Sequence, residues 1–324
     1  MTIDCHVHLS ALLPGHGQMS TKILGSPRFW VLAKLFGVPI DPSRTDEALE
    51  RYLVAQLDAA VEIDAAVLLA FDAVYTTGGR RDDANTHLEL DNDYVRLLVR
   101  RHPKLLFGCS VHPYRRDAVE ELERCIRGGA VLCKWLPITQ GIDPSHPKCF
   151  PFYECLAHHG LPLLSHTGGE KMLPNINDKA DPLLLMPAVR RGVTVIAAHC
   201  GTRSAKSETD YLPQWSRMAL EHEHFYGDTA ALNLPTRSYA YKVLMADERL
   251  RAKLIHGSDW PVYPVPPASS LGLVEALRQW EQGNWLRRDM AIKRKIGLDD
   301  AHFARASTIL KMPPVPSPGI PGEG

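Results

Sequence analysis

The chain has 324 residues, of which 45% are hydrophobic and 23% are charged, a composition typical of soluble globular proteins. Its 37 lysine and arginine residues balance its 37 aspartate and glutamate residues, and the formal net charge of +0 excludes an overall basic field for nucleic acid or an anionic membrane. No apolar run is long enough to span a bilayer, and the seven cysteines form no C-x-x-C pair. We therefore expect a cytoplasmic protein with free thiols that acts on a small molecule, and homo-oligomerisation stays open.

The first predicted strand, residues 3–9, carries two histidines. His6 and His8 are separated by one residue, so on a strand their side chains point to the same side. Two imidazoles at a strand end make half of a site for a divalent metal. The alternative is a pair of ordinary polar residues near the N-terminus, and the rest of the chain decides between the two.

The segment that follows, residues 10–43, is rich in proline and glycine and contains short apolar runs. A loop of this length in a compact domain usually lines or covers a site. Thr45 or Asp46 is expected to cap the next helix, in which apolar residues recur at helical spacing through residues 49–57.

From residue 65 onward, buried strands alternate with amphipathic helices. The further predicted strands are residues 65–71, 105–111, 130–135, 161–165, 193–198, 225–228 and 253–258. The predicted helices between and after them are residues 94–99, 118–126, 152–158, 183–191, 212–220, 239–246 and 271–280. The strands are continuously apolar, which is typical of parallel sheets covered by helices on both faces.

Eight strand–helix units in a chain of this length predict a single α/β domain, a (β/α)8 TIM barrel. An open doubly wound sheet is the alternative, disfavoured because no glycine-rich phosphate loop follows the first strand. We expect this domain to cover residues 1–312, with residues 301–310 as a final packing helix. The tail, residues 313–324, is mostly proline and glycine and is expected to be disordered.

Ionisable side chains recur where the predicted strands end. Active sites of such barrels lie at the carboxyl ends of the strands, where these side chains would converge. Packing explains this set poorly, because an unpaired polar group in a barrel interior costs about 1–3 kcal/mol. The arrangement therefore predicts a metal site built from His6 and His8 on the first strand, Lys134 on the fourth, His166 on the fifth, His199 on the sixth and Asp259 on the eighth.

At these positions the sequence resembles the amidohydrolase superfamily of metal-dependent barrel hydrolases. More specifically it is similar to the amidohydrolase 2 branch, which includes enzymes like aminocarboxymuconate semialdehyde decarboxylase. The matching motifs are Asp4-Cys5-His6-Val7-His8, Lys134-Trp135-Leu136-Pro137, Leu163-Leu164-Ser165-His166-Thr167-Gly168, Ala198-His199-Cys200-Gly201 and His256-Gly257-Ser258-Asp259-Trp260-Pro261.

The resemblance implies a role for each residue. The catalytic metal would be held by His6, His8, His166 and Asp259. Three imidazoles and a carboxylate suit Zn²⁺, although manganese, iron or nickel accept the same ligands. Asp259 would carry the proton from a metal-activated water to the leaving group. His199 would polarise the substrate or bind a second metal, and Lys134 would either bridge two metals as a carbamate or hold a substrate carboxylate.

Four further residues are candidates for substrate binding. Trp135 and Trp260 follow site residues and would wall the pocket, or they pack the top of the barrel. Arg203 and Arg237 follow the sixth and seventh strands, where arginine often clamps carboxylates, although most loop arginines are simply solvated.

Two other residues at predicted strand ends are candidates for supporting roles in the site. His112 ends the third predicted strand and either faces the pocket or caps its loop. Asp228 ends the seventh and would orient a ligand histidine.

Three functions follow from this interpretation. The first is a metal-dependent hydrolase acting on a small amide, lactone or ester that carries a carboxylate, an expectation based on Lys134, Arg203 and Arg237. The second is a non-oxidative decarboxylase or hydratase of a small acid at the same metal site. The third, a non-catalytic metal-binding barrel, is disfavoured by the general-base candidate Asp259.

Overall fold

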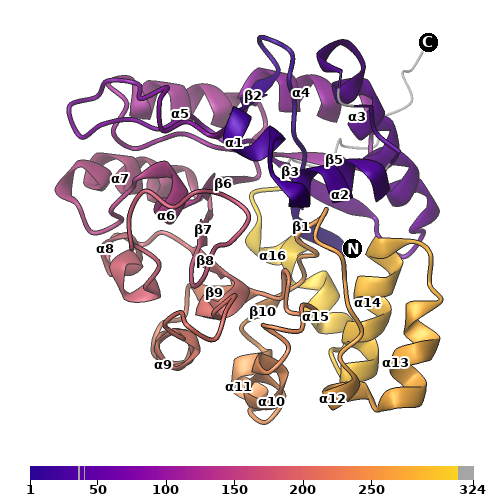
Figure 1. Cartoon of the computed structure of the whole chain (residues 1–324). Helices are drawn as coiled ribbons and strands as arrows, with labels where there is room; N and C mark the ends of the chain where they lie inside the picture. Colours follow the sequence, from indigo (N-terminus) through magenta and orange to yellow (C-terminus); the bar gives the residue numbers. More distant parts are fainter. Residues whose placement is uncertain (36, 40, 313–324) are drawn as a thin grey trace, which may run out of the picture.

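A computed structural model describes residues 1–35, 37–39 and 41–312, so the tail expected at residues 313–324 lies outside the described residues. Its centre is a barrel of eight parallel strands with helices around it (Figure 1). In their order around the barrel the strands are β1 (Ile3–His8), β3 (Ala65–Leu69), β5 (Leu105–Cys109), β6 (Leu132–Trp135), β7 (Leu163–His166), β8 (Val195–Ala198), β9 (Phe225–Asp228) and β10 (Leu254–Ile255). The predicted (β/α)8 architecture is confirmed.

The barrel closes where β10 meets β1. The Cys5 N–H donates to the carbonyl oxygen of His256 at 3.0 Å, and the Asp259 N–H donates to that of His6 at 2.9 Å. A third bond runs from the His8 N–H to the Trp260 carbonyl at 2.8 Å. The first and last thirds of the chain therefore meet at the strand ends that carry the predicted ligands.

Helices cover the outside of the barrel. The longer ones are α2 (Pro27–Leu35), α3 (Pro42–Ala59), α4 (Asn92–Arg101), α5 (Ala118–Arg127), α7 (Phe150–His159), α9 (Leu212–Glu221), α13 (Leu273–Trp280) and α14 (Trp285–Ile296). Shorter ones are α1 (Thr21–Leu24), α6 (Pro137–Gln140), α8 (Met186–Val189), α10 (Ala240–Leu244), α11 (Glu248–Arg251), α12 (Ala268–Leu271), α15 (Asp300–Ala304) and α16 (Ala306–Ile309). No helix in the described part of the chain has both the length and the apolar character that crossing a membrane requires.

The prediction that Thr45 or Asp46 caps helix α3 is wrong. Helix α3 starts at Pro42, and the side chain of Asp41 accepts the hydrogen bond of the Ser43 N–H. Proline at the first helical position after an aspartate cap is a favoured start, because its missing N–H would have no partner there. Asp46 instead accepts hydrogen bonds from the N–H groups of Leu12 and Leu13, which holds the loop after β1.

The long segment after β1 is more ordered than a loop. Strand β2 (Gly17–Met19) pairs antiparallel with β4 (Leu88–Leu90), and α1 and α2 follow it. Because β2 follows β1 and β4 follows β3, this small sheet lies beyond the carboxyl ends of those strands. That this segment lines or covers the site stays a prediction.

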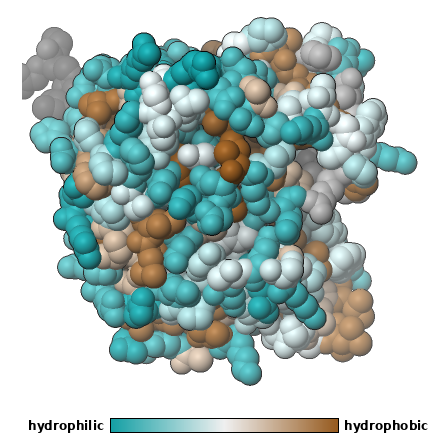
Figure 2. Space-filling view, turned by 60° about the vertical axis from the view of Figure 1, so that its left-hand side comes forward, coloured by the Kyte–Doolittle hydropathy of each residue, from teal (hydrophilic) through white to brown (hydrophobic). Residues whose placement is uncertain are grey.

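The core has two layers, because each strand is buried on both faces. Val67 and Leu69 of β3 point into the barrel, whereas Ala66 and Leu68 pack against the helices. Ala306 of α16 belongs to the interior layer, and the Lys311 N–H donates to the Val131 carbonyl, so the C-terminal helices close the barrel floor. Outside, the face shown in Figure 2 is mainly hydrophilic, with hydrophobic residues in small separate patches.

Candidate metal centre

Three of the predicted metal ligands meet at the carboxyl ends of β1 and β10. The Nε2 atoms of His6 and His8 lie 3.0 Å apart, and Asp259 Oδ1 lies 3.2 Å from the first and 3.4 Å from the second. Metal–ligand bonds of about 2.0–2.2 Å at ordinary angles place ligand atoms about 3.0–3.5 Å apart. The residues therefore fit a divalent metal in their present positions.

Asp228 at the end of β9 sets the orientation of His6. Its Oδ2 lies 2.6 Å from His6 Nδ1, and its Oδ1 accepts hydrogen bonds from the N–H groups of His199 and Ala230. Burial, with the charge of Lys134, lowers the pKa of His6 well below its usual value, so the ring is neutral. With the proton on Nδ1 and shared with Asp228, the lone pair of Nε2 faces the other two ligands.

The Asp228→Asn variant is expected to bind a divalent metal at this site about 10–100-fold more weakly, because the amide no longer holds His6 by a charged contact. Competition with a chromophoric chelator measures the dissociation constant. Asp247→Asn, at the cap of α11, is the matched control. Equal metal affinity in the Asp228 variant and in the parent protein would show that Asp228 does not orient His6 for metal binding.

His166 and His199 border the three ligands. The ring centroids of the two histidines are 4.8 Å apart, and that of His199 is 5.3 Å from that of His6. His199 Nδ1 lies 2.9 Å from the carbonyl oxygen of Ala230 and donates to it, so Nε2 remains available to the site. His166 Nε2 lies 3.3 Å from the Gly169 carbonyl, so the fourth predicted ligand is at the edge of the cluster.

Lys134 of β6 lies inside the barrel against the ligands. Its Nζ is 2.9 Å from His6 Nε2, and burial lowers the pKa of its ammonium group to about 8. Near pH 8 the neutral and the ammonium forms of this side chain are thus both present. A carbamate forms from the neutral amine, whereas the ammonium form is the one that would hold a substrate carboxylate.

Backbone strain is concentrated at the same strand ends. Among the described residues, the non-glycine residues with positive φ are His199, Cys200, Ala231 and Asp259, with φ between 53° and 64°. Such conformations cost about 1–3 kcal/mol each and persist where surrounding structure imposes them. At Gly257 a Cβ would lie 2.8 Å from that of His6, so only glycine allows β10 to approach β1 this closely.

The two predicted tryptophans pack the barrel instead of lining the cluster. Trp135 is fully buried, donates from Nε1 to the Val111 carbonyl at 2.8 Å, and contacts Phe152 and Tyr153 of α7. It alternates with Lys134 along β6 and so points outward, which agrees with the packing alternative rather than the pocket wall. The ring of Trp260 contacts those of Tyr52 and Trp285.

The two arginines predicted to bind substrate make different contacts. Arg237 is buried and donates to the Thr202 carbonyl and hydroxyl at 2.7 Å and to the Gly169 carbonyl at 2.6 Å, so it joins the loops after β7 and β8. Its Nε has no partner among the described residues. The guanidinium of Arg203 lies 4.8 Å from the ring centroid of Tyr239, a cation–π contact.

His112 caps its loop. The Tyr114 N–H donates to its Nδ1 at 3.1 Å, and its Nε2 lies 2.9 Å from the Gln140 carbonyl, to which it donates. The Nδ1 and Nε2 atoms of the ring thus both bond to the main chain.

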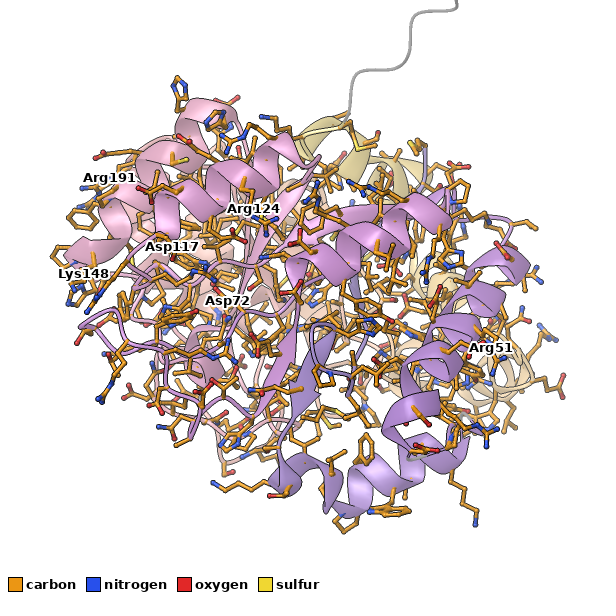
Figure 3. All side chains as sticks on the ribbon, turned by 90° about the horizontal axis from the view of Figure 1, so that it is seen from above. Arg51, Asp72, Asp117, Arg124, Lys148 and Arg191 are labelled. Atoms are coloured by element: carbon orange, nitrogen blue, oxygen red, sulfur yellow. The ribbon has the colours of Figure 1, made fainter. Side chains whose placement is uncertain are left out.

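Sequence reasoning missed two carboxylates on this side of the barrel. Asp72 follows β3, accepts from the His112 N–H at 2.7 Å and pairs with Arg115. Arg115 also pairs with Asp117, and Figure 3 labels the two aspartates. Burial raises the pKa of Asp72 to about 6. Glu170 follows β7, and burial raises its pKa. For Asp72 the available signal was its position directly after the apolar run 65–71.

Comparisons with known proteins identify the family of the chain. The family model Amidohydro_2, described as Amidohydrolase, matches residues 3–296. A comparison with curated proteins gives no significant match.

Solved structures share the fold at low sequence identity. An uncharacterized TIM-barrel protein from Bordetella bronchiseptica is 16% identical, with a TM-score of 0.56 and coverage of 90% of this chain and 98% of that one. A probable 2-pyrone-4,6-dicarboxylic acid hydrolase from Acinetobacter baumannii, with citric acid bound, is 15% identical, with a TM-score of 0.55 and coverage of 95% and 98%. A dihydroxybenzoic acid decarboxylase from Polaromonas, with manganese and 2-nitroresorcinol bound, is 14% identical, with a TM-score of 0.53 and coverage of 95% and 97%.

These identities show the fold alone, whereas the family model covers nearly the whole chain. Because that match runs from the first strand of the barrel to the end of α14, this chain belongs to the amidohydrolase family, in its amidohydrolase 2 branch of metal-dependent enzymes.

Proposed function

We propose that the protein is a zinc-dependent hydrolase of a small amide, lactone or ester that carries a carboxylate. The observation that carries this proposal is the convergence of His6, His8 and Asp259 beside the buried amine of Lys134. Two imidazoles and a carboxylate suit Zn²⁺. His8 is partly exposed, so substrate and water can reach these side chains.

The chain supplies proton transfer and polarisation. Bound Zn²⁺ supplies Lewis acidity that lets water lose a proton near neutral pH. The Asp259 carboxylate would take that proton and return it to the leaving group, a role typical of general acid–base catalysis. His199, with Nδ1 bonded to the Ala230 carbonyl, would polarise the scissile carbonyl through Nε2.

The anionic part of the substrate would bind to Lys134. Its buried amine adjoins the metal ligands. The buried guanidinium of Arg237 bonds to the loops after β7 and β8, and its Nε has no partner in the described residues. Basic groups in a buried site favour an anion both by direct contact and by concentrating it at the mouth. The A. baumannii neighbour, solved with citric acid, supports a carboxylate ligand for this fold.

Decarboxylation of a small acid is the second candidate. It is favoured by the fold likeness to the Polaromonas decarboxylase. The same metal ligands and the same Lys134 would hold a hydroxylated benzoic acid. The two functions differ in outcome, since hydrolysis produces a new carboxylate and decarboxylation releases carbon dioxide.

A paired substrate screen with the zinc-loaded protein tests the proposal. Lactones, esters and amides with a carboxylate are compared with neutral analogues, and hydroxybenzoic acids are assayed for carbon dioxide. We expect hydrolysis of the acidic members. Lys134→Met should raise KM for them by about 10-fold or more, as expected for one charge-assisted hydrogen bond of about 1.5–3 kcal/mol. It should leave KM of neutral analogues and the metal content unchanged.

Exposed Lys242 of α10 supplies the matched control, Lys242→Met. Carbon dioxide release without hydrolysis would assign the decarboxylase function. Turnover of neutral analogues alone would refute the anion site. Loss of metal in Lys134→Met, with rescue by small carboxylic acids, would instead identify Lys134 as a carbamate bridging two ions.

A further inference from the structure

A second group of metal-ligating side chains lies outside the barrel, on two neighbouring helices. Glu123 of α5 and Cys155 and His159 of α7 place a carboxylate oxygen, a thiol sulfur and an imidazole nitrogen within 4.8 Å of one another. Apart from the strand-end ligands, it is the one such group in the described part of the chain.

The helical geometry presents these groups together. Cys155 and His159 are four residues apart, so both lie on the same face of α7. That face meets α5, which packs beside α7 on the outside of the barrel (Figure 1). In Figure 3 the labels Arg124, on α5, and Arg191 mark this side of the molecule. The Arg191 guanidinium packs on α7, 3.6 Å from the ring centroid of Phe150.

These three residues lie toward the opposite end of the barrel from the candidate metal centre. His159 ends α7, and the chain then enters β7 at Leu163, so this end of the helix lies near the amino ends of the strands. In such barrels the amino ends serve stability and the carboxyl ends serve catalysis. A ligand here would act on the packing of α5 against α7.

We propose that Glu123, Cys155 and His159 form a peripheral zinc site that links α5 to α7. Sulfur, nitrogen and oxygen donors together suit Zn²⁺ better than the harder Mg²⁺ or Ca²⁺. Three protein ligands leave a fourth tetrahedral position for water on the solvent side, where His159 and Glu123 are partly exposed.

The bonds that these residues already make are compatible with a metal. Glu123 Oε2 lies 3.5 Å from Arg127 Nη1, an exposed pair between residues four apart. Such pairs contribute little, so the carboxylate can turn toward a cation. Cys155 is a free thiol and is 8% exposed, which shields it from bulk solvent while its neighbours remain reachable.

Cobalt titration of the metal-free protein tests this site without using activity. Co²⁺ replaces Zn²⁺, and a thiolate ligand gives a charge-transfer absorption in the near ultraviolet. The strand-end ligands are only nitrogen and oxygen atoms, so this absorption reports the peripheral site alone. We expect its intensity to correspond to one Co²⁺ per chain and to be complete by two equivalents of added Co²⁺, because the strand-end site also binds the ion. It should disappear when Zn²⁺ is added.

The variants assign the ligands. Cys155→Ser should abolish the absorption, and His159→Gln should weaken Co²⁺ binding there by at least about 10-fold, the minimum expected when direct ligation is lost. The neighbouring exposed His158→Gln is the matched control and should behave like the parent, as should a protein lacking both His6 and His8. A folded parent protein without the absorption at saturating Co²⁺, or persistence of the absorption in Cys155→Ser, would overturn the proposal.

Discussion

Replacing Asp259 by asparagine is expected to lower turnover of the best substrate by about 10²–10⁴-fold, the usual contribution of a positioned general acid–base. Asparagine keeps the shape of the side chain but cannot accept the proton. The carboxylate lies within 3.4 Å of Nε2 in both His6 and His8, so the variant also tests whether Asp259 is a metal ligand. Turnover is therefore measured on samples of known metal content.

Asp247→Asn, at the partly exposed cap residue of α11, serves as the control and should leave turnover unchanged, since asparagine caps helices as well as aspartate does. A near-normal rate in Asp259→Asn with a full complement of metal would refute the proton-transfer role. A rate loss that is restored by added metal would assign Asp259 to ligation alone.

Lys293→Met is expected to lower the free energy of unfolding by about 3–5 kcal/mol, the usual effect of breaking a buried ion pair. Lys293 of α14 is fully buried and donates from Nζ to Asp289 Oδ2 at 2.5 Å and to the Gly257 carbonyl at 2.7 Å. Removing the cation leaves the Asp289 carboxylate buried without its charge partner. Urea denaturation of the metal-free protein gives the magnitude.

The double variant Lys293→Met/Asp289→Leu provides the control. Because both charges are removed, it should recover a large part of the lost free energy. A single variant within about 0.5 kcal/mol of the parent, the range of ordinary surface substitutions, would show that the pair does not stabilise the fold. Since Gly257 lies two residues before Asp259, metal affinity of the single variant reports how far this pair supports the metal centre.

Local patterns predicted the barrel well because each strand is a short apolar run buried on both faces. In β3, for example, the run 65–71 needs no partner to be recognised as buried, and the structure gives Ala65–Leu69. No helix was assigned to residues 285–296, where the buried apolar residues Trp285, Leu286, Met290 and Ile292 are interspersed with many lysines and arginines. Burial of Lys293 there depends on Asp289 and Gly257, which no local pattern reveals.

In the candidate site, too, some features follow from the local sequence and others depend on contacts between distant segments. Spacing on one strand places His6 and His8 on one side, and this follows from the two-residue period of a strand. The contact of His6 with Asp228, 222 residues away, exists only because the barrel brings β1 near β9. Likewise, Arg237 had the residue type of a carboxylate clamp, but its bonds to Thr202 and Gly169 come from loop packing.

The sequence by itself determined the eight-strand alternation, the family and the residues at the strand ends, because apolar runs and their terminal side chains are local features. Only the tertiary structure decided which of those side chains meet. It brought His6, His8 and Asp259 to within hydrogen-bonding distances, turned Trp135 outward, and placed Cys155 and His159 beside α5. The physical reason is that strand register, barrel closure and helix packing depend on contacts between segments far apart in the chain, which side-chain spacing along one segment does not encode.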